Sequence, residues 1–304
     1  MSEVILATGG YDEKVVLWNP TTEVASKVLP LREVHVNALR VSTDRRNLAV
    51  AAFKSLKIYD LASGATVPAH SLDAHQGNIM SMGYPRRGNW MYTTGEDGTI
   101  RIWDLNTDRA QRCYEHRSPV NTAVLHPNQS EIICGDEQGR ISIYDLTTNS
   151  MKIQRQYEDE GIRSLQVSGD ASFIMASNNN GVCFGIDPVT LDIIFTQQLH
   201  NTYITRCVLS PDSKLLATCS ADKTVKIWKV NMQDADSTLS LEKALIGHKM
   251  WVWDAAFTCD SAYIATASTD NTAKLWECST GRIARNYMGV HSKGITSIVL
   301  NDLA

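Results

Sequence analysis

Apolar and polar residues alternate along this chain in short runs, and almost nowhere do apolar residues recur at helical spacing. The alternation is clearest in 99–104 (Thr-Ile-Arg-Ile-Trp-Asp), 224–229 (Thr-Val-Lys-Ile-Trp-Lys) and 272–277 (Thr-Ala-Lys-Leu-Trp-Glu). Such runs predict half-buried β-strands, because successive side chains of a strand point to opposite faces. Turn-forming residues precede them, for example Asp97 and Gly98, so tight hairpins are predicted as well.

The same short sequence pattern recurs along the whole chain. Its aromatic position, or the equivalent, falls at Trp18, Tyr59, Trp103, Tyr144, Ile186, Trp228 and Trp276. Successive positions differ by 41, 44, 41, 42, 42 and 48 residues. Three further apolar stretches accompany each copy, so each unit is expected to hold four strands. The repeat therefore predicts an all-β fold, a seven-bladed β-propeller that spans 1–304 as a single domain, and the longest step predicts an insertion at the polar loop 231–238.

The two ends of the chain are predicted to complete one unit together. Thr8, Asp12 and Trp18 keep the spacing of the repeat with no histidine upstream, whereas His291 and the apolar run 295–300 stand near the other end. We expect the last strand to form the inner edge of the shared blade, because ring closure removes two exposed sheet edges. The predicted blades are 292–304 plus 1–31, 32–73, 74–115, 116–157, 158–199, 200–247 and 248–291.

A set of histidine, threonine, aspartate and tryptophan recurs at spacings of 18, 4 and 6 residues. A buried histidine needs partners for both ring nitrogens; a carboxylate and a hydroxyl can supply them, and an indole N–H can donate to the hydroxyl. We interpret the sets as structural networks within blades. Three complete sets are His75, Thr93, Asp97, Trp103; His200, Thr218, Asp222, Trp228; and His248, Thr266, Asp270, Trp276, and the fourth joins His291 to Thr8, Asp12 and Trp18.

The repetition argues against catalysis by these residues. A hydrolase triad occurs once, in a cleft, whereas these sets recur in several blades. The histidines stand about 40 residues apart in separate blades, so they cannot converge on one metal ion. We therefore predict no catalytic residue, no metal site and no cofactor.

Composition limits the partners further. The chain has 29 basic and 33 acidic residues and a net charge of −4, without the basic excess that is usual in general nucleic-acid binders. No apolar run approaches eighteen residues, so no insertion into a membrane is predicted. The seven cysteines are odd in number and form no Cys-x-x-Cys pair, which favours free thiols in a reducing cytosol over disulfides or a zinc cage.

The histidine, aspartate and Trp-Asp pattern resembles the WD-repeat family over the full length of the chain. Several segments further resemble the small, G-protein-β-subunit-like WD-repeat subunits of TOR kinase complexes, namely 4–12, 89–97, 126–131, 210–222 and 250–253. That resemblance implies a non-catalytic adaptor that binds the C-terminal lobe of the TOR kinase domain, assembles with the other subunits of both TOR complexes and supports active-site organisation and signalling to growth. It implies no small-molecule substrate and a cytoplasmic location, with any peripheral association with endomembranes made through the complex.

The resemblance also points to an interaction surface. In WD-repeat proteins the residues three and five places after each histidine line the mouth of the channel, and the residue before the turn aspartate lies beside them. Large aromatic side chains, methionine and arginine are typical of interface hot spots. The candidate partner-binding residues are Tyr11, Asn37, Met80, Glu96, Asn121, Glu137, Arg163, Tyr203, Trp251 and Trp253. The alternative for Trp251 and Trp253 is simple packing between blades.

Two other functions remain open. The chain could be a WD-repeat adaptor of another assembly, such as a substrate receptor of a cullin ubiquitin ligase. Many such receptors carry an arginine two residues after the Trp-Asp pair, and those places here hold Ala62, Asn106, Thr147 and Asn231. An enzyme would need convergent titratable groups at the channel mouth, where the sequence places only Glu96, Glu137 and Arg163.

Overall fold

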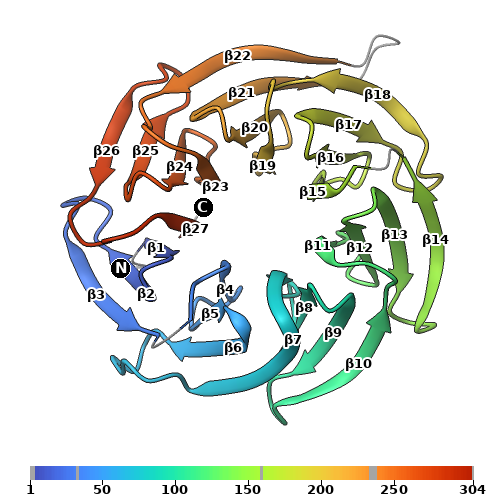
Figure 1. The fold of residues 1–304 in the computed structure, drawn as a ribbon, viewed down its shortest axis with the longest axis horizontal. Helices are drawn as coiled ribbons and strands as arrows, with labels where there is room; N and C mark the ends of the chain where they lie inside the picture. Colours follow the sequence, from blue (N-terminus) through green and yellow to red (C-terminus); the bar gives the residue numbers. More distant parts are fainter. Residues whose placement is uncertain (1–3, 32–33, 158–159, 233–237, 303–304) are drawn as a thin grey trace.

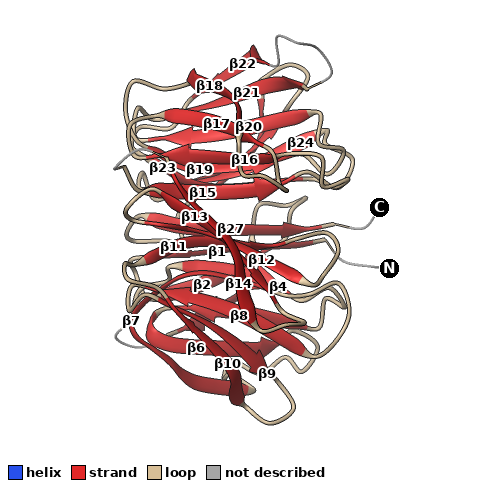
Figure 2. Ribbon diagram, turned by 90° about the vertical axis from the view of Figure 1, so that its right-hand side faces the viewer, coloured by secondary structure: helices blue, strands red, loops and turns tan. Residues whose placement is uncertain are grey.

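A computed structural model describes residues 4–31, 34–157, 160–232 and 238–302. Antiparallel sheets stand in a ring around a central channel (Figure 1), and Figure 2 shows only strands and loops among the described residues. No helix long and apolar enough to cross a membrane occurs in these ranges. The seven-bladed all-β fold predicted from the repeat is thereby confirmed. Most of the insertion predicted at 231–238 lies outside the described residues.

Each blade consists of four strands, and the first strand of each lies nearest the channel. Blade 1 contains β27 (Ile295–Asn301), β1 (Ile5–Gly10), β2 (Lys14–Trp18) and β3 (Ala25–Pro30). Blade 2 contains β4 (Ala38–Val41), β5 (Asn47–Ala51), β6 (Phe53–Asp60) and the first part of β7 (His70–Gly83). Blade 3 contains the rest of β7, β8 (Trp90–Gly95), β9 (Thr99–Asp104) and β10 (Arg109–Glu115).

The remaining four blades follow in chain order. Blade 4 contains β11 (Val120–Leu125), β12 (Glu131–Asp136), β13 (Arg140–Asp145) and β14 (Ser150–Gln156). Blade 5 contains β15 (Ile162–Val167), β16 (Ile174–Asn178), β17 (Val182–Ile186) and β18 (Ile193–Gln198). Blade 6 contains β19 (Ile204–Leu209), β20 (Leu215–Ser220), β21 (Thr224–Asn231) and β22 (Thr238–Ile246). Blade 7 contains β23 (Val252–Phe257), β24 (Tyr263–Ser268), β25 (Ala273–Glu277) and β26 (Ile283–Tyr287).

Strand β7 belongs to two blades. It has 14 residues; residues 70–73 and Asn78 pair with β6 as the outer strand of blade 2, and the part from Ile79 pairs with β8 as the inner strand of blade 3. The two blades therefore form one seven-stranded sheet, whereas the other sheets have four strands each.

The shared blade closes the ring as the sequence predicted. Strand β27 lies antiparallel to β1, with Leu6 opposite Leu300 and Thr8 opposite Ile298. This pairing gives β1 a partner on both sides, so the hydrogen-bonding edge that faces the channel is β27. Ile298 is buried in an apolar cluster that continues into blade 7.

Six of the seven innermost strands share a bulge near the start of the strand, whereas β4 pairs with β5 without one. At each bulge the pairing register with the next strand shifts by one residue, so one residue has no opposite partner. A bulge redirects a side chain relative to the sheet, and here the side chains concerned line a cavity in the channel. The residues without an opposite partner are Met80, Asn121, Arg163, Thr205, Trp253 and Thr296.

We expect Ile298→Ala to lower the free energy of unfolding by about 2–5 kcal/mol, because it opens a cavity at the joint between the two ends of the chain. The matched control is Ile283→Ala on the outer strand β26, where the side chain is 44% exposed, against 1% for Ile298. Chemical denaturation followed by circular dichroism measures both. Equal effects of the two substitutions would contradict the role given to the closing strand.

Candidate protein-binding site at the channel mouth

The repeated polar sets form chains of hydrogen bonds inside the blades. In blade 3 the indole Nε1 of Trp103 donates to Thr93 Oγ1 (2.9 Å), and Thr93 Oγ1 lies 2.7 Å from Nε2 of His75. Nδ1 of His75 lies 2.9 Å from Asp97 Oδ1. Because the indole can only donate, the hydroxyl proton is free to bond Nε2, and Nδ1–H then donates to the carboxylate.

The same chain recurs in three other blades with distances of 2.7–3.0 Å. The structure brings together His200, Asp222, Thr218 and Trp228 in blade 6, His248, Asp270, Thr266 and Trp276 in blade 7, and His291, Asp12, Thr8 and Trp18 in blade 1. The last set spans both ends of the chain, so a polar network and a strand pair reinforce one another at the ring closure.

Burial keeps the blade 3 network in one charge state. It lowers the pKa of His75 from 6.5, and this outweighs the opposite effect of Asp97. Burial alone would raise the pKa of Asp97, but hydrogen bonds from the Gln76 backbone N–H, His75 and Thr99 hold it at about 2. At neutral pH the histidine is therefore neutral and the aspartate ionised, which suits a static support. Thr93 is fully buried and His75 is only 5% exposed, so these groups are packed inside the blade and are not open to a substrate.

Blades 4 and 5 replace the network. In blade 4, Nε2 of His116 lies 2.8 Å from the Tyr144 hydroxyl and 3.4 Å from Cys134 Sγ. In blade 5, Ala176 and Ile186 take the threonine and tryptophan positions and pack in an apolar cluster. Apolar packing thus holds blade 5 where the polar chain is missing.

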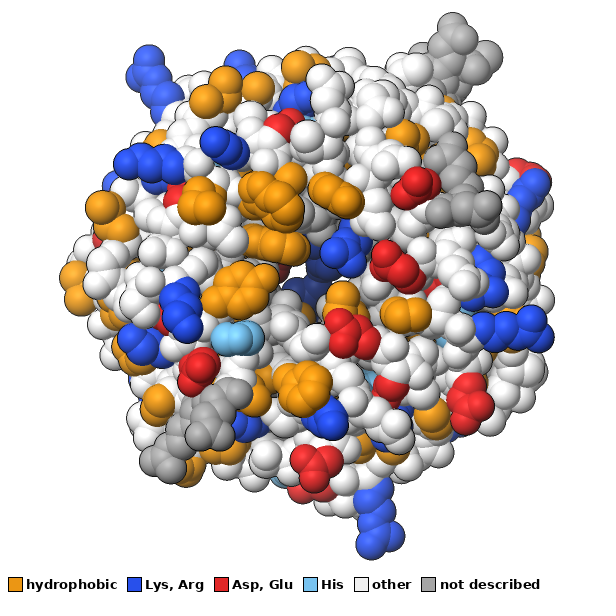
Figure 3. Space-filling view, viewed as in Figure 1, with side chains coloured by type: hydrophobic (Ala, Val, Ile, Leu, Met, Phe, Trp, Pro, Cys, Tyr) orange, Lys and Arg blue, Asp and Glu red, His pale blue; other side chains and the backbone are white. Residues whose placement is uncertain are grey.

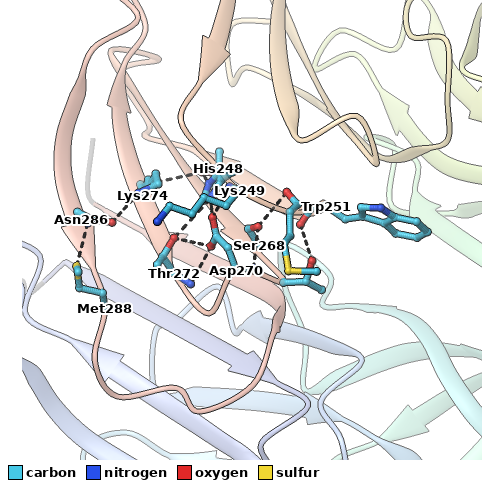
Figure 4. Close-up of polar contacts among 12 residues, drawn as sticks. His248, Lys249, Trp251, Ser268, Asp270, Thr272, Lys274, Asn286 and Met288 are labelled. Carbon is cyan, nitrogen blue, oxygen red and sulfur yellow. Dashed lines mark hydrogen bonds and ion pairs between the residues drawn. The ribbon is translucent and has the colours of Figure 1, made fainter.

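Three of the candidate interface residues lie together at the mouth of the channel. The ring centroids of Tyr203 and Trp251 are 6.3 Å apart, and those of Trp251 and Trp253 are 5.9 Å apart. Tyr203 is 50% and Trp251 42% exposed, whereas Trp253 is half-buried and lines the channel. Figure 3 shows hydrophobic side chains gathered around the central hole, and in Figure 4 the Trp251 side chain points away from the His248–Asp270 network.

We call Tyr203, Met250, Trp251 and Trp253 the aromatic patch. Sequence analysis missed Met250, which is exposed and precedes Trp251. Tyr11 stands apart from the patch, with its ring against His35 at a centroid distance of 5.4 Å. His35 was also missed, because it lies before an inner strand and outside the repeated set.

The polar candidates are held by one another rather than gathered in the patch. Glu96 accepts hydrogen bonds from the backbone and side-chain nitrogens of Asn78, and Asn78 also accepts one from Asn37. These contacts fix the Glu96 carboxylate at the rim, where it is exposed.

A second polar group crosses blades 4 and 5. Asn121 is only 7% exposed; its amide donates to Glu137 (2.5 Å) and to the Ile162 carbonyl (3.2 Å). Arg163 lies 4.0 Å from Glu137. Asn121 is therefore a support for the Glu137 carboxylate and offers little surface of its own. Met80 is partly buried and lines the channel.

Fold and site together define a class of protein: a WD-repeat propeller with an aromatic patch on its channel mouth. A family model described as "WD domain, G-beta repeat" matches residues 66–104, 108–145, 192–229 and 239–277. A solved β-propeller domain of Cps50 (Swd1) from Myceliophteria thermophila superposes with a TM-score of 0.76, covering 86% of this chain and 88% of that one. Its sequence identity is 21%, so this likeness concerns the fold alone. Among the described residues, no three His, Cys, Asp or Glu side chains are grouped to hold a metal ion.

Full-length relatives narrow the class to a family. The "Target of rapamycin complex subunit LST8" of Mus musculus is 42% identical, with 98% of this chain and 95% of that protein covered. The protein of the same name from Saccharomyces cerevisiae is 39% identical over 99% of both chains. The "Target of rapamycin complex subunit wat1" of Schizosaccharomyces pombe is 39% identical, with 98% and 96% covered. The chain belongs to the LST8 family of WD-repeat proteins.

The charge state of the blade 3 network gives a pH prediction. The folded-state pKa of His75 lies below its ordinary value, so the unfolded chain takes up this proton first and stability falls as pH drops below about 6.5. The folded-state pKa of Asp97 is also lowered, so its contribution is present above about pH 4 and is lost as pH falls towards 2. Both effects have the same sign, and we expect the free energy of unfolding to decrease steadily from pH 7 to pH 2.

The double variant His75→Gln, Asp97→Asn tests this assignment. We expect it to be less stable at pH 7 by roughly 1–3 kcal/mol and to show a shallower dependence on pH, because His75 and Asp97 no longer titrate. Urea denaturation at several pH values measures both quantities. Asp73→Asn, at an exposed position of β7, is the control that should keep the wild-type slope. An unchanged slope in the double variant would refute the assignment.

Proposed function

We propose that this protein is a non-catalytic subunit of a TOR complex, and that its channel-mouth face binds the C-terminal lobe of the TOR kinase domain. The names of its full-length relatives support membership of such a complex. We choose the channel-mouth face as the binding surface because of the aromatic patch. Its side chains Tyr203, Met250 and Trp251 are exposed to solvent. Exposed large apolar groups that cluster in this way mark interaction sites.

The patch is suited to tight binding for a mechanical reason. Trp251 and Trp253 emerge from the start of an inner strand of blade 7, and Tyr203 precedes the inner strand of blade 6. Side chains on a rigid sheet lose little conformational freedom when they dock, so more of the free energy of burial appears as affinity. Tryptophan and tyrosine are also the residues that most often dominate interface energies.

Two carboxylates at the rim would complement the patch. Hydrogen bonds to Asn78 and Asn121 already orient Glu96 and Glu137, respectively. Charged groups fixed in advance favour a partner with basic groups opposite them and speed its association. In this proposal the same hydrogen bonds give the two carboxylates a supporting and recognition role at the rim, without chemistry.

The effect on the kinase would be conformational. A rigid propeller that binds only one arrangement of the kinase lobe raises the population of that arrangement by its differential affinity. In this proposal the propeller supports the ordered form of nearby active-site elements, and it contributes no group to the chemistry.

We expect Trp251→Ala combined with Trp253→Ala to abolish co-purification of the TOR kinase. Truncating a hot-spot residue costs at least about 2 kcal/mol, or roughly 30-fold in affinity, so two of them should remove stable binding. The measurement is affinity capture of the tagged full-length chain from cells, with quantification of the kinase. The matched control is Met151→Ala with Ile193→Ala, which truncates exposed apolar side chains on the outer strands β14 and β18.

A melting curve for each variant separates a lost interface from a lost fold. Recovery of normal amounts of kinase by the double tryptophan variant, in a folded state, would contradict the proposed surface. An equal loss in the outer-strand control would show that the effect is not specific to the channel mouth.

A further inference from the structure

The channel holds a concentration of positive charge that the interaction surface does not explain. Arg40 from β4, Arg163 from β15 and Arg206 from β19 line one cavity, together with Trp253 and Asp254 from β23. Figure 3 shows blue side chains inside the central hole. The whole chain has a net charge of −4, so the basic interior of the channel runs against the overall balance.

Among the described residues that line this cavity Asp254 is the one carboxylate, and its oxygens are already engaged. Oδ2 accepts hydrogen bonds from Ser297 Oγ (3.0 Å) and the Ile298 backbone N–H (3.1 Å). Oδ1 accepts one from the Ala255 N–H (3.0 Å) and lies 3.4 Å from Nε of Arg206. A single carboxylate therefore faces both of the deeper guanidinium groups.

The excess charge falls on Arg40. Its Nη1 donates to the Leu39 carbonyl (2.8 Å), a contact that supplies no negative charge. Burial and then the neighbouring Arg206 lower the pKa of Arg40, and Asp254 offsets this only in part. A guanidinium keeps its proton in proteins, so the positive charge stays in the channel and favours a compensating anion.

A second group in the same cavity lacks an acceptor. Nε1 of Trp253 is buried and makes no hydrogen bond within the described part of the chain. An indole N–H can only donate, so it needs an acceptor atom. The bulge at Trp253 is the feature that turns this side chain toward the channel rather than into the blade.

We propose that the channel binds a small free oxyanion of the phosphate class between Arg40 and Arg206, with the indole N–H of Trp253 as a further donor. The cavity has a volume of about 120 Å³, which leaves room for a compact ion of this class. Water could satisfy the indole, but only an anion also balances the second guanidinium. Arg163 also lines the cavity, but Glu137 lies 4.0 Å from it and offsets its charge, so the proposed site depends on Arg40 and Arg206.

Such an ion would connect blade 2 to blades 6 and 7, which lie far from it in the sequence. Arg40 belongs to blade 2, Arg206 to blade 6 and Trp253 to blade 7. Because the unfolded chain has no such site, binding stabilises the folded ring in proportion to the logarithm of ligand concentration over Kd. This inference is independent of the kinase and of the proposed function.

The test is a titration of the full chain with sodium phosphate, against sodium chloride at matched ionic strength. Isothermal titration calorimetry gives the affinity, and a thermal melt gives the stabilisation. We expect saturable binding with one site, and a melting temperature that rises with phosphate and not with chloride. Arg40→Met, which removes the charge and keeps an extended apolar side chain, should weaken phosphate binding about 10-fold or more.

Arg282→Met is the matched control, because this arginine is exposed on the outer part of blade 7 and should leave the affinity unchanged. If Arg40→Met does not fold, Trp253→Phe decides the matter; it keeps an aromatic ring without the N–H, and we expect weaker phosphate binding. Absence of saturable binding in the wild type would overturn the proposal. So would equal affinities in the wild type and in the folded channel variants, since the anion would then bind elsewhere.

Discussion

The pairing of β27 with β1 is the contact on which the ring depends. Every blade covers one face of each neighbour, so an open ring would expose two apolar faces and an unpaired strand edge. The chain removes both by placing its last described strand inside its first sheet. The His291–Asp12 contact crosses the same joint, where Nδ1 and Oδ1 are 3.0 Å apart. The two ends of the chain are far apart in sequence. Backbone hydrogen bonds between β1 and β27 and a buried chain of polar side chains hold them together.

The blades are supported in two physically different ways. Four of them contain a directed chain of hydrogen bonds from tryptophan through threonine and histidine to aspartate. Such a chain leaves no buried donor unsatisfied, and it ties the turn before the third strand to the first strand. In blade 5 apolar side chains take the threonine and tryptophan positions, and Asn178 hydrogen-bonds the turn before the third strand. The backbone of the repeat is thus compatible with either solution, as long as each buried polar group has a partner.

Bulges in the innermost strands place additional side chains of the scaffold at the mouth of the channel. A regular strand would present only alternate residues to the channel, whereas the bulge adds one extra side chain at the mouth. In some blades that residue hydrogen-bonds to the neighbouring blade. The Thr205 hydroxyl, for example, donates to the Val252 carbonyl at 2.5 Å. In others it is Arg163 or Trp253, which face the cavity. The same irregularity therefore supplies contacts between blades in one place and candidate binding groups in another.

The sequence by itself determined the fold class, the shared terminal blade and the membership of the polar sets. These depend on period-two patterning and on spacings that repeat along the chain, and both survive without knowledge of three-dimensional contacts. The tertiary structure alone decided which rim residues meet. Tyr203 and Trp251 belong to different blades, and the burial of Asn121 follows from contacts with Glu137 and Ile162. Only the tertiary structure shows that Arg40, Arg206 and Trp253 line one cavity. Closing the ring brings these residues together, although they lie in different repeats of the chain.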